Sequence, residues 1–120
     1  MIKSYIAAED IPAYRFVKFS SGNAALAVSS SDNIIGISEE NAKDEGECVD
    51  IHLDGVFEVQ AGGTFEAGAV LTADTEGKAV EASTSDNIGA LALESAQADG
   101  DVVQVLVTIQ RNAETSTDEG

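Results

Sequence analysis

The sequence predicts an all-β protein, a small β-barrel or sandwich built from two duplicated halves, with an extended N-terminal arm and very little helix. Three observations indicate this fold: an internal repeat, short strands with alternating apolar residues, and turns that contain glycine. The 120 residues are enough for one domain, and aromatic residues make up only 5% of them. We therefore expect a thin core of Val, Ile, Leu and Ala, which contact with other chains would strengthen.

The repeat has a constant offset of 54 residues. Residues 31–34 (Ser-Asp-Asn-Ile) return unchanged as residues 85–88. The same offset carries three alternating apolar residues onto three others, namely Val49, Ile51 and Leu53 onto Val103, Val105 and Val107. Two copies are too few for a solenoid, which needs at least three stacked units. We therefore expect two halves of the same topology that close on each other.

The strands are expected where apolar and polar residues alternate between turn signals. In chain order, the predicted strands are 15–19, 34–37, 48–53, 90–93 and 103–109. Residues 21–23 and 75–78 are predicted hairpin turns, because each contains a glycine that tolerates positive φ. Residues 39–45 and 94–98 are the only candidate helices, and their equivalent places in the two halves favour short connecting turns.

These elements divide the chain into three parts. Residues 1–12 are interpreted as the N-terminal arm, and residues 13–110 as a single β domain with repeats over 13–60 and 67–110. Residues 111–120 are polar and are interpreted as a flexible acidic tail.

Charge restricts the possible partners. The chain has 22 acidic and 6 basic residues, a formal net charge of -16. We expect it to bind neither nucleic acid nor an anionic membrane surface, because both attract Lys and Arg and would repel this chain. No apolar run reaches the length of a membrane span, and the first residues lack the features of a signal peptide, so we expect synthesis in a cytoplasm.

No catalytic, cofactor-binding or metal-binding residues are predicted, and the protein is not expected to be an enzyme. Cys48 is the only cysteine and His52 the only histidine, too few for a zinc site or for a nucleophile with its base. His52 is interpreted as a solvated strand residue. The acidic connector over residues 39–47 lacks the spacing of a calcium loop and is interpreted as a solvated charge run.

Lys78 suggests an alternative function. Residues 74–81 resemble the hairpin that carries the modified lysine of lipoyl domains, which are also small, acidic and built from two β halves. The glycine directly before Lys78 shifts this lysine from the hairpin tip, and an exposed turn lysine is the simpler interpretation. A small β binding module, such as a lipoyl-like carrier domain, stays the alternative.

Four stretches together carry a resemblance to a known family. They are residues 11–19 (IPAYRFVKF), 54–63 (DGVFEVQAGG), 67–80 (AGAVLTADTEGKAV) and 88–107 (IGALALESAQADGDVVQVLV). In order and spacing they resemble the capsid cement, or head decoration, proteins of tailed phages and prophages. The resemblance implies a structural protein that binds the outer surface of an assembled head and stabilises it. It further implies the major capsid protein as partner, a location on the virion, and self-association as a homotrimer or a dimer.

The N-terminal arm is the predicted capsid contact. Its apolar side chains have no evident place in the repeat, and sixteen excess negative charges favour an apolar contact supported by main-chain hydrogen bonds. The candidate contact residues are Ile2, Tyr5, Ile6 and Ile11.

Overall fold

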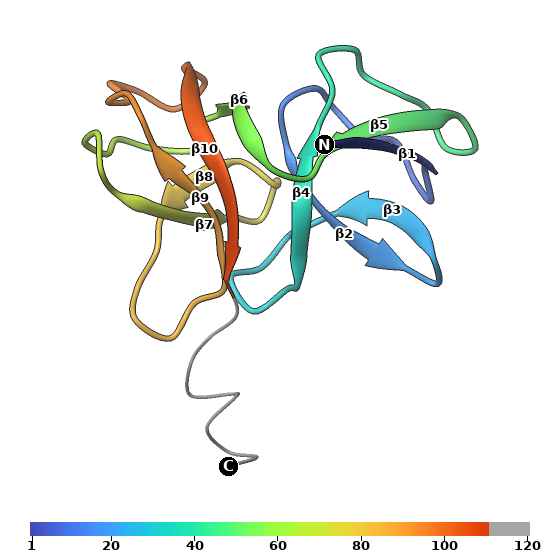
Figure 1. The fold of residues 1–120 in the computed structure, drawn as a ribbon, viewed down its shortest axis with the longest axis horizontal. Helices are drawn as coiled ribbons and strands as arrows, with labels where there is room; N and C mark the ends of the chain where they lie inside the picture. Colours follow the sequence, from blue (N-terminus) through green and yellow to red (C-terminus); the bar gives the residue numbers. More distant parts are fainter. Residues whose placement is uncertain (111–120) are drawn as a thin grey trace.

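The structure is a computed structural model that describes residues 1–110 and contains two five-stranded antiparallel sheets (Figure 1). The first sheet is formed by β1 (Ile2–Ile6), β2 (Phe16–Ser20), β3 (Asn23–Leu26), β4 (Ile34–Ser38) and β5 (Cys48–His52). The second is formed by β6 (Gly55–Gln60), β7 (Val70–Ala73), β8 (Ala79–Glu81), β9 (Ile88–Ala92) and β10 (Val102–Gln110). The predicted all-β class is confirmed. Residues 1–110 form no helix, and hence none that could cross a membrane.

The two sheets have the same strand order. The first runs β1-β5-β4-β2-β3 and the second β6-β10-β9-β7-β8, so each strand has a counterpart in the other half. The equivalent strands β5 and β10 both lie second from the edge, as the repeat predicted. Each sheet also curls so that its two edges approach, through isolated bridges between Ala7 and Ala24 and between Ala61 and Ala79.

The repeat begins earlier than the sequence suggested. Residues 2–6, expected as an arm outside the repeat, form edge strand β1, which pairs with β5 as β6 pairs with β10. The halves therefore meet near residue 54, rather than between residues 60 and 67. The pairing was missed because residues 2–6 and 56–60 share only an apolar pattern, and a strand partner distant in sequence leaves no local signal. The predicted tail, residues 111–120, lies outside the described residues.

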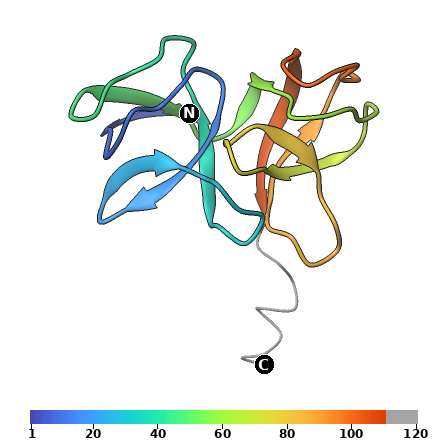
Figure 2. The same ribbon diagram turned by 180° about the vertical axis from the view of Figure 1, so that it is seen from behind.

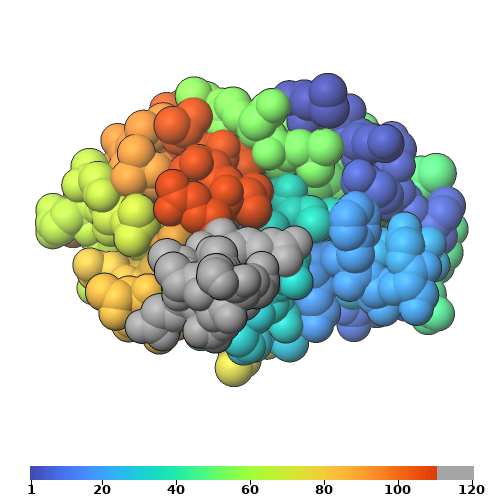
Figure 3. Space-filling model, turned by 60° about the horizontal axis from the view of Figure 1, so that its bottom comes forward, coloured from blue at the N-terminus to red at the C-terminus, as the bar shows by residue number. Residues whose placement is uncertain are grey.

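The largest core cluster extends across both halves. The first half contributes Phe16, Ala27, Ile34 and Ile37, and they pack with the apolar interior of the second sheet. A smaller cluster fills the curl of the first sheet. In the space-filling view, β4 lies between the two lobes (Figure 3). The halves are thus parts of one packed body.

Backbone contacts hold the segment before β2 against the second half, seen from behind in Figure 2. The Gln60 N–H donates to the Tyr14 carbonyl at 2.9 Å, and the Phe16 N–H donates to the Gly77 carbonyl at 2.8 Å. The Arg15 guanidinium reaches the Glu76 carbonyl at 2.8 Å. Residues 14–16 therefore lie between the end of β6 and the β7–β8 turn, and this position directs the Phe16 side chain into the second half.

The repeated Asp-Asn loops also meet. The side-chain amide of Asn87 donates to the carbonyls of Ser31 and Asp32 at 3.1 and 3.0 Å. Asn87 is only 9% exposed, so these bonds satisfy a polar group that would otherwise be costly to bury. The motif that revealed the repeat thus joins the two copies.

We predict that replacing Gly89→Ala destabilises the protein. An added Cβ would lie 2.7 Å from Cε1 of Phe16, whose ring is fully buried and has no room to move. The expected loss is about 1–3 kcal/mol, typical of overpacking a core. Urea unfolding measures it, with Gly63→Ala as the control, since no atom lies within 4 Å of a Cβ there. Equal free energies of unfolding for the two variants would contradict the close packing of Phe16 against Gly89.

Candidate functional site

The residues considered for metal binding do not form a site. Among residues 1–110, no group of three or more His, Cys, Asp or Glu side chains is placed to hold a metal ion. The acidic connector satisfies backbone donors instead: Glu47 accepts from the N–H of Asp44 at 2.7 Å, and Glu39 accepts from the N–H of Asp50 at 2.9 Å. Cys48 is a free, exposed thiol at the start of β5.

His52 differs from its expected solvated state. Its ring stacks on Phe57 of the second half, with centroids 3.4 Å apart and planes 10° from parallel. Burial lowers the pKa of His52 below its ordinary value of 6.5, against the opposing influence of Asp50 and Glu39. The acidic neighbours Asp50 and Asp54 favour a solvated side chain, but the stacking partner Phe57 comes from the next strand in the chain. His52 is therefore a packing residue between the halves.

Lys78 is not a freely exposed turn lysine. Its ammonium group pairs with Asp99 at 3.1 Å and with Glu76 at 3.2 Å, and only 15% of its side chain is exposed. The hydrogen bond that Lys78 donates to Asp99, followed by the one it donates to Glu76, raises the pKa of Lys78. A carrier lysine needs a free amine at a hairpin tip, so this environment does not favour the lipoyl-like alternative.

The four predicted contact residues fall into three different environments. Ile11 is 1% exposed and belongs to the core of the first sheet, so its prediction as a surface contact is wrong. A bridge to Lys43 anchors its backbone and turns its side chain inward. Ile2 and Ile6 are 56% and 44% exposed and share the outer face of edge strand β1. Tyr5 points to the opposite face, where its ring packs edge-on against the ring of Phe19, with the two centroids 5.2 Å apart.

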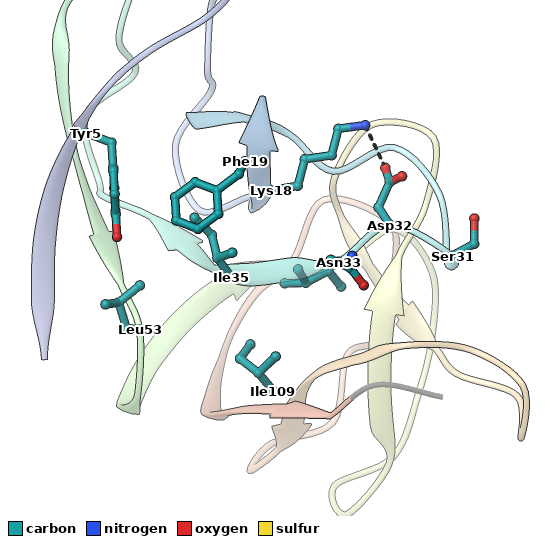
Figure 4. Close-up of a pocket in the computed structure, with 10 residues that line it drawn as sticks. Tyr5, Lys18, Phe19, Ser31, Asp32, Asn33, Ile35, Leu53 and Ile109 are labelled. Carbon is teal, nitrogen blue, oxygen red and sulfur yellow. Dashed lines mark hydrogen bonds and ion pairs between the residues drawn. The ribbon is translucent and has the colours of Figure 1, made fainter. Parts of the chain in front are cut away.

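Tyr5 and Phe19 belong to an apolar groove at the open end of the first sheet. The groove has a volume of about 600 Å³, and its apolar side chains face one another across it (Figure 4). Ile34, Ile35, Leu53 and Ile109 complete its apolar lining. An ion pair between Lys18 and Asp32, at 3.1 Å, lies at its side. The sequence carries no signal for this groove, because its lining comes from four strands and two connecting segments that are far apart in the chain.

A row of exposed apolar side chains crosses the outer face of the second sheet. Val56, Leu106, Leu91 and Val70 stand directly opposite one another on β6, β10, β9 and β7. Val56 is 62% exposed, Val70 42% and Leu106 37%, and Leu91 is half-buried. We call these four residues the Val70 row. Four aligned apolar residues on one sheet face are typical of a surface that is covered by another molecule.

The candidate site is therefore a set of apolar surfaces. They are the outer face and free edge of β1, the groove, and the Val70 row. Each lies on a molecule whose remaining surface is rich in carboxylates, so contact there depends on burying apolar area and on shape.

Comparison with known proteins agrees with a structural role. A family model described as phage cement protein matches residues 2–109. No curated protein matches the chain. Among solved structures, the crystal structure of the head fiber gp8.5 N base of bacteriophage phi29 is similar in fold, with a TM-score of 0.70 and 22% sequence identity. The similarity covers 92% of this chain and 96% of that one.

We predict that His52 makes stability depend on pH. Its pKa is lower in the folded protein, so between that value and 6.5 the unfolded chain binds more protons and unfolding is favoured as the pH falls. The His52→Phe variant keeps an aromatic ring on Phe57 but does not titrate. Lowering the pH from about 7 to about 5 should therefore destabilise the wild type relative to this variant. Urea unfolding across this range measures the difference, and parallel pH profiles would exclude the effect.

Proposed function

This chain belongs to the phage cement protein family and has a capsid decoration role, and we propose that it binds the outer surface of an assembled head through the major capsid protein. The observation that supports this most directly is an apolar edge strand, β1, on a strongly acidic protein. The role proposed is stabilisation of the shell, with no catalytic step. The protein is proposed to be made in the host cytoplasm and to end on the virion.

The proposed contact is the outer face and free edge of β1. Ile2 and Ile6 project from this face, and β1 lies at the end of its sheet, so its main chain is available to a strand of the capsid protein. Such strand addition supplies hydrogen bonds from the backbone and specificity from alternate side chains. Tyr5 and Ile11 are not part of this contact, because they point to the groove and the core.

The sixteen excess negative charges favour an apolar attachment. Carboxylates placed against a protein surface lose hydration, and the chain has few cations to pair with them. The same charge makes binding to nucleic acid or to an anionic membrane unfavourable. A homotrimer, matched to threefold positions of an icosahedral shell, is the proposed assembly, with a dimer as the alternative.

Substitution in β1 tests the contact. We predict that the double variant Ile2→Asp and Ile6→Asp binds purified undecorated heads at least about tenfold more weakly than the wild type, the equivalent of about 1.4 kcal/mol. Occupancy after sedimentation of the heads measures it. Removing the whole strand is less informative, because Ala7 and Ile11 just beyond it belong to the core. The control is Val28→Asp, an exposed apolar position in the loop after β3, outside the proposed contact. If the double variant bound as well as this control, the contact would lie elsewhere.

Salt provides an independent test of the same proposal. Contacts between exposed charges weaken as the screening length falls from about 10 Å at 0.1 M salt to about 3 Å at 1 M. An apolar, hydrogen-bonded attachment should survive this change or become tighter. Occupancy of purified heads is measured before and after transfer to near-molar salt. Release of the protein into solution would show that attachment is mainly ionic.

A further inference from the structure

The Val70 row has a counterpart in the first half that is covered. Strand pairing in the first sheet aligns the four residues that lie 54 positions before those of the Val70 row. They are Ile2, His52, Ile37 and Phe16. Phe16 and Ile37 are fully buried, and His52 lies under Phe57 of the second half. Three members of this row are thus covered by the other half of the same chain and Ile2, at its end, is exposed, whereas every member of the Val70 row is at least partly exposed.

The second half receives Phe16 in an apolar hollow. The ring lies so close to Gly89 that a Cβ there would be 2.7 Å from it. Phe16 shares its core cluster with Val59, Ala73 and Val107 of the second half. Gly89 lies directly against the ring, and we call Gly89 and these three residues of the shared core the hollow.

The counterpart of this hollow is the groove of the first half. The offset of 54 places Val59, Ala73, Gly89 and Val107 on Tyr5, Phe19, Ile35 and Leu53, which are four of the groove residues. The hollow of the second half is filled by Phe16, while the groove is open, with Phe19 50% exposed. Each chain thus has one filled hollow and one open groove, and likewise one covered row and one exposed row.

The sizes of the side chains are complementary. The residue that enters the hollow is Phe16, and its counterpart in the exposed row is the smaller Val70. The hollow has small residues, Ala73 and Gly89, where the groove has the larger Phe19 and Ile35. Val70 is smaller than Phe16, and the groove has larger lining residues than the hollow. The combined side-chain volume of the two contacts is therefore similar, as close packing requires.

We propose that the Val70 row of one copy binds the groove of a second copy, in the way that Phe16 and its row bind the second half within the chain. This contact joins two different surfaces, so it is heterologous and continues from copy to copy, forming a ring where the rotation between copies closes and a filament where it does not. The proposal goes beyond capsid attachment, because it assigns the surfaces by which copies join. It is independent of the β1 contact and can be tested without a capsid.

The charge of the chain decides how this association responds to salt. Copies with a net charge of -16 repel one another, and the contact joins the apolar row to the apolar part of the groove, whose lining also includes Lys18, Asp32 and neighbouring polar residues. Screening reduces the repulsion without weakening apolar burial. Association is therefore expected to increase in near-molar salt.

Two single substitutions test the proposal. Val70→Asp disables the row and leaves the groove intact, and Phe19→Asp disables the groove and leaves the row intact. Light scattering after gel filtration should show a multiple of 12.4 kDa for the wild type and 12.4 kDa for each variant alone. An equimolar mixture of the two should form a dimer that stops growing, because only one intact row and one intact groove remain. Val28→Asp, at a site 41% exposed, is the control and should associate like the wild type.

Circular dichroism of each variant establishes that it is folded, and Leu106→Asp is a second row variant if Val70→Asp unfolds. A wild-type protein that stays at 12.4 kDa at every concentration and salt tested would overturn the proposal. So would a row variant that associates normally, or a mixture of folded variants that stays monomeric. If Phe19→Asp associated normally while the row variants did not, the contact would be row against row, and the assignment of the groove would be wrong.

Discussion

The structure depends on one interaction, the burial of Phe16 from the first half inside the second. The aromatic ring is fully buried against Gly89, and backbone bonds from Tyr14 and Phe16 hold the segment in place. Without it, each half would be a five-stranded sheet with a small apolar interior, and domains of about that size bury a smaller share of their surface than larger ones and are only marginally stable. The same interaction requires a glycine in β9 and brings β4 between the two lobes.

Duplication explains the strand order but not the final shape, because the two copies do not contact each other symmetrically. Phe16 enters the second half, whereas its twin Val70 enters nothing within the chain. Near the Asp-Asn loops equivalent residues do meet, where the side-chain amide of Asn87 donates to Asn33 at 3.4 Å. Each half has both kinds of surface, a row and a hollow. A contact that joins the row of one half to the hollow of the other therefore leaves one row and one hollow free. The first half therefore keeps an open groove, and the second half keeps the exposed Val70 row.

These exposed apolar surfaces suit the role of a decoration protein. The few reactive side chains of this protein would suit an enzyme less well. Lys78 is held by two carboxylates and His52 is stacked against an aromatic ring, so both serve the fold. The carboxylates that dominate the surface oppose nonspecific contact between copies and with other acidic surfaces. Specific contact then depends on places where apolar side chains are exposed and aligned, as on β1 and across the second sheet.

The sequence alone determined the all-β class, the positions of most strands and the duplication, because alternation and turn residues act over a few positions and need no knowledge of the partner strand. It also supplied the family resemblance, through the order of four stretches along nearly the whole chain. Only the tertiary structure decided that residues 2–6 pair with β5, that Ile11 is buried, and that His52 lies under Phe57. It alone decided which of two equivalent apolar rows is covered. Strand partners and burial depend on contacts between residues distant in the chain, and the period of two along a strand shows which residues share a face without showing what covers it.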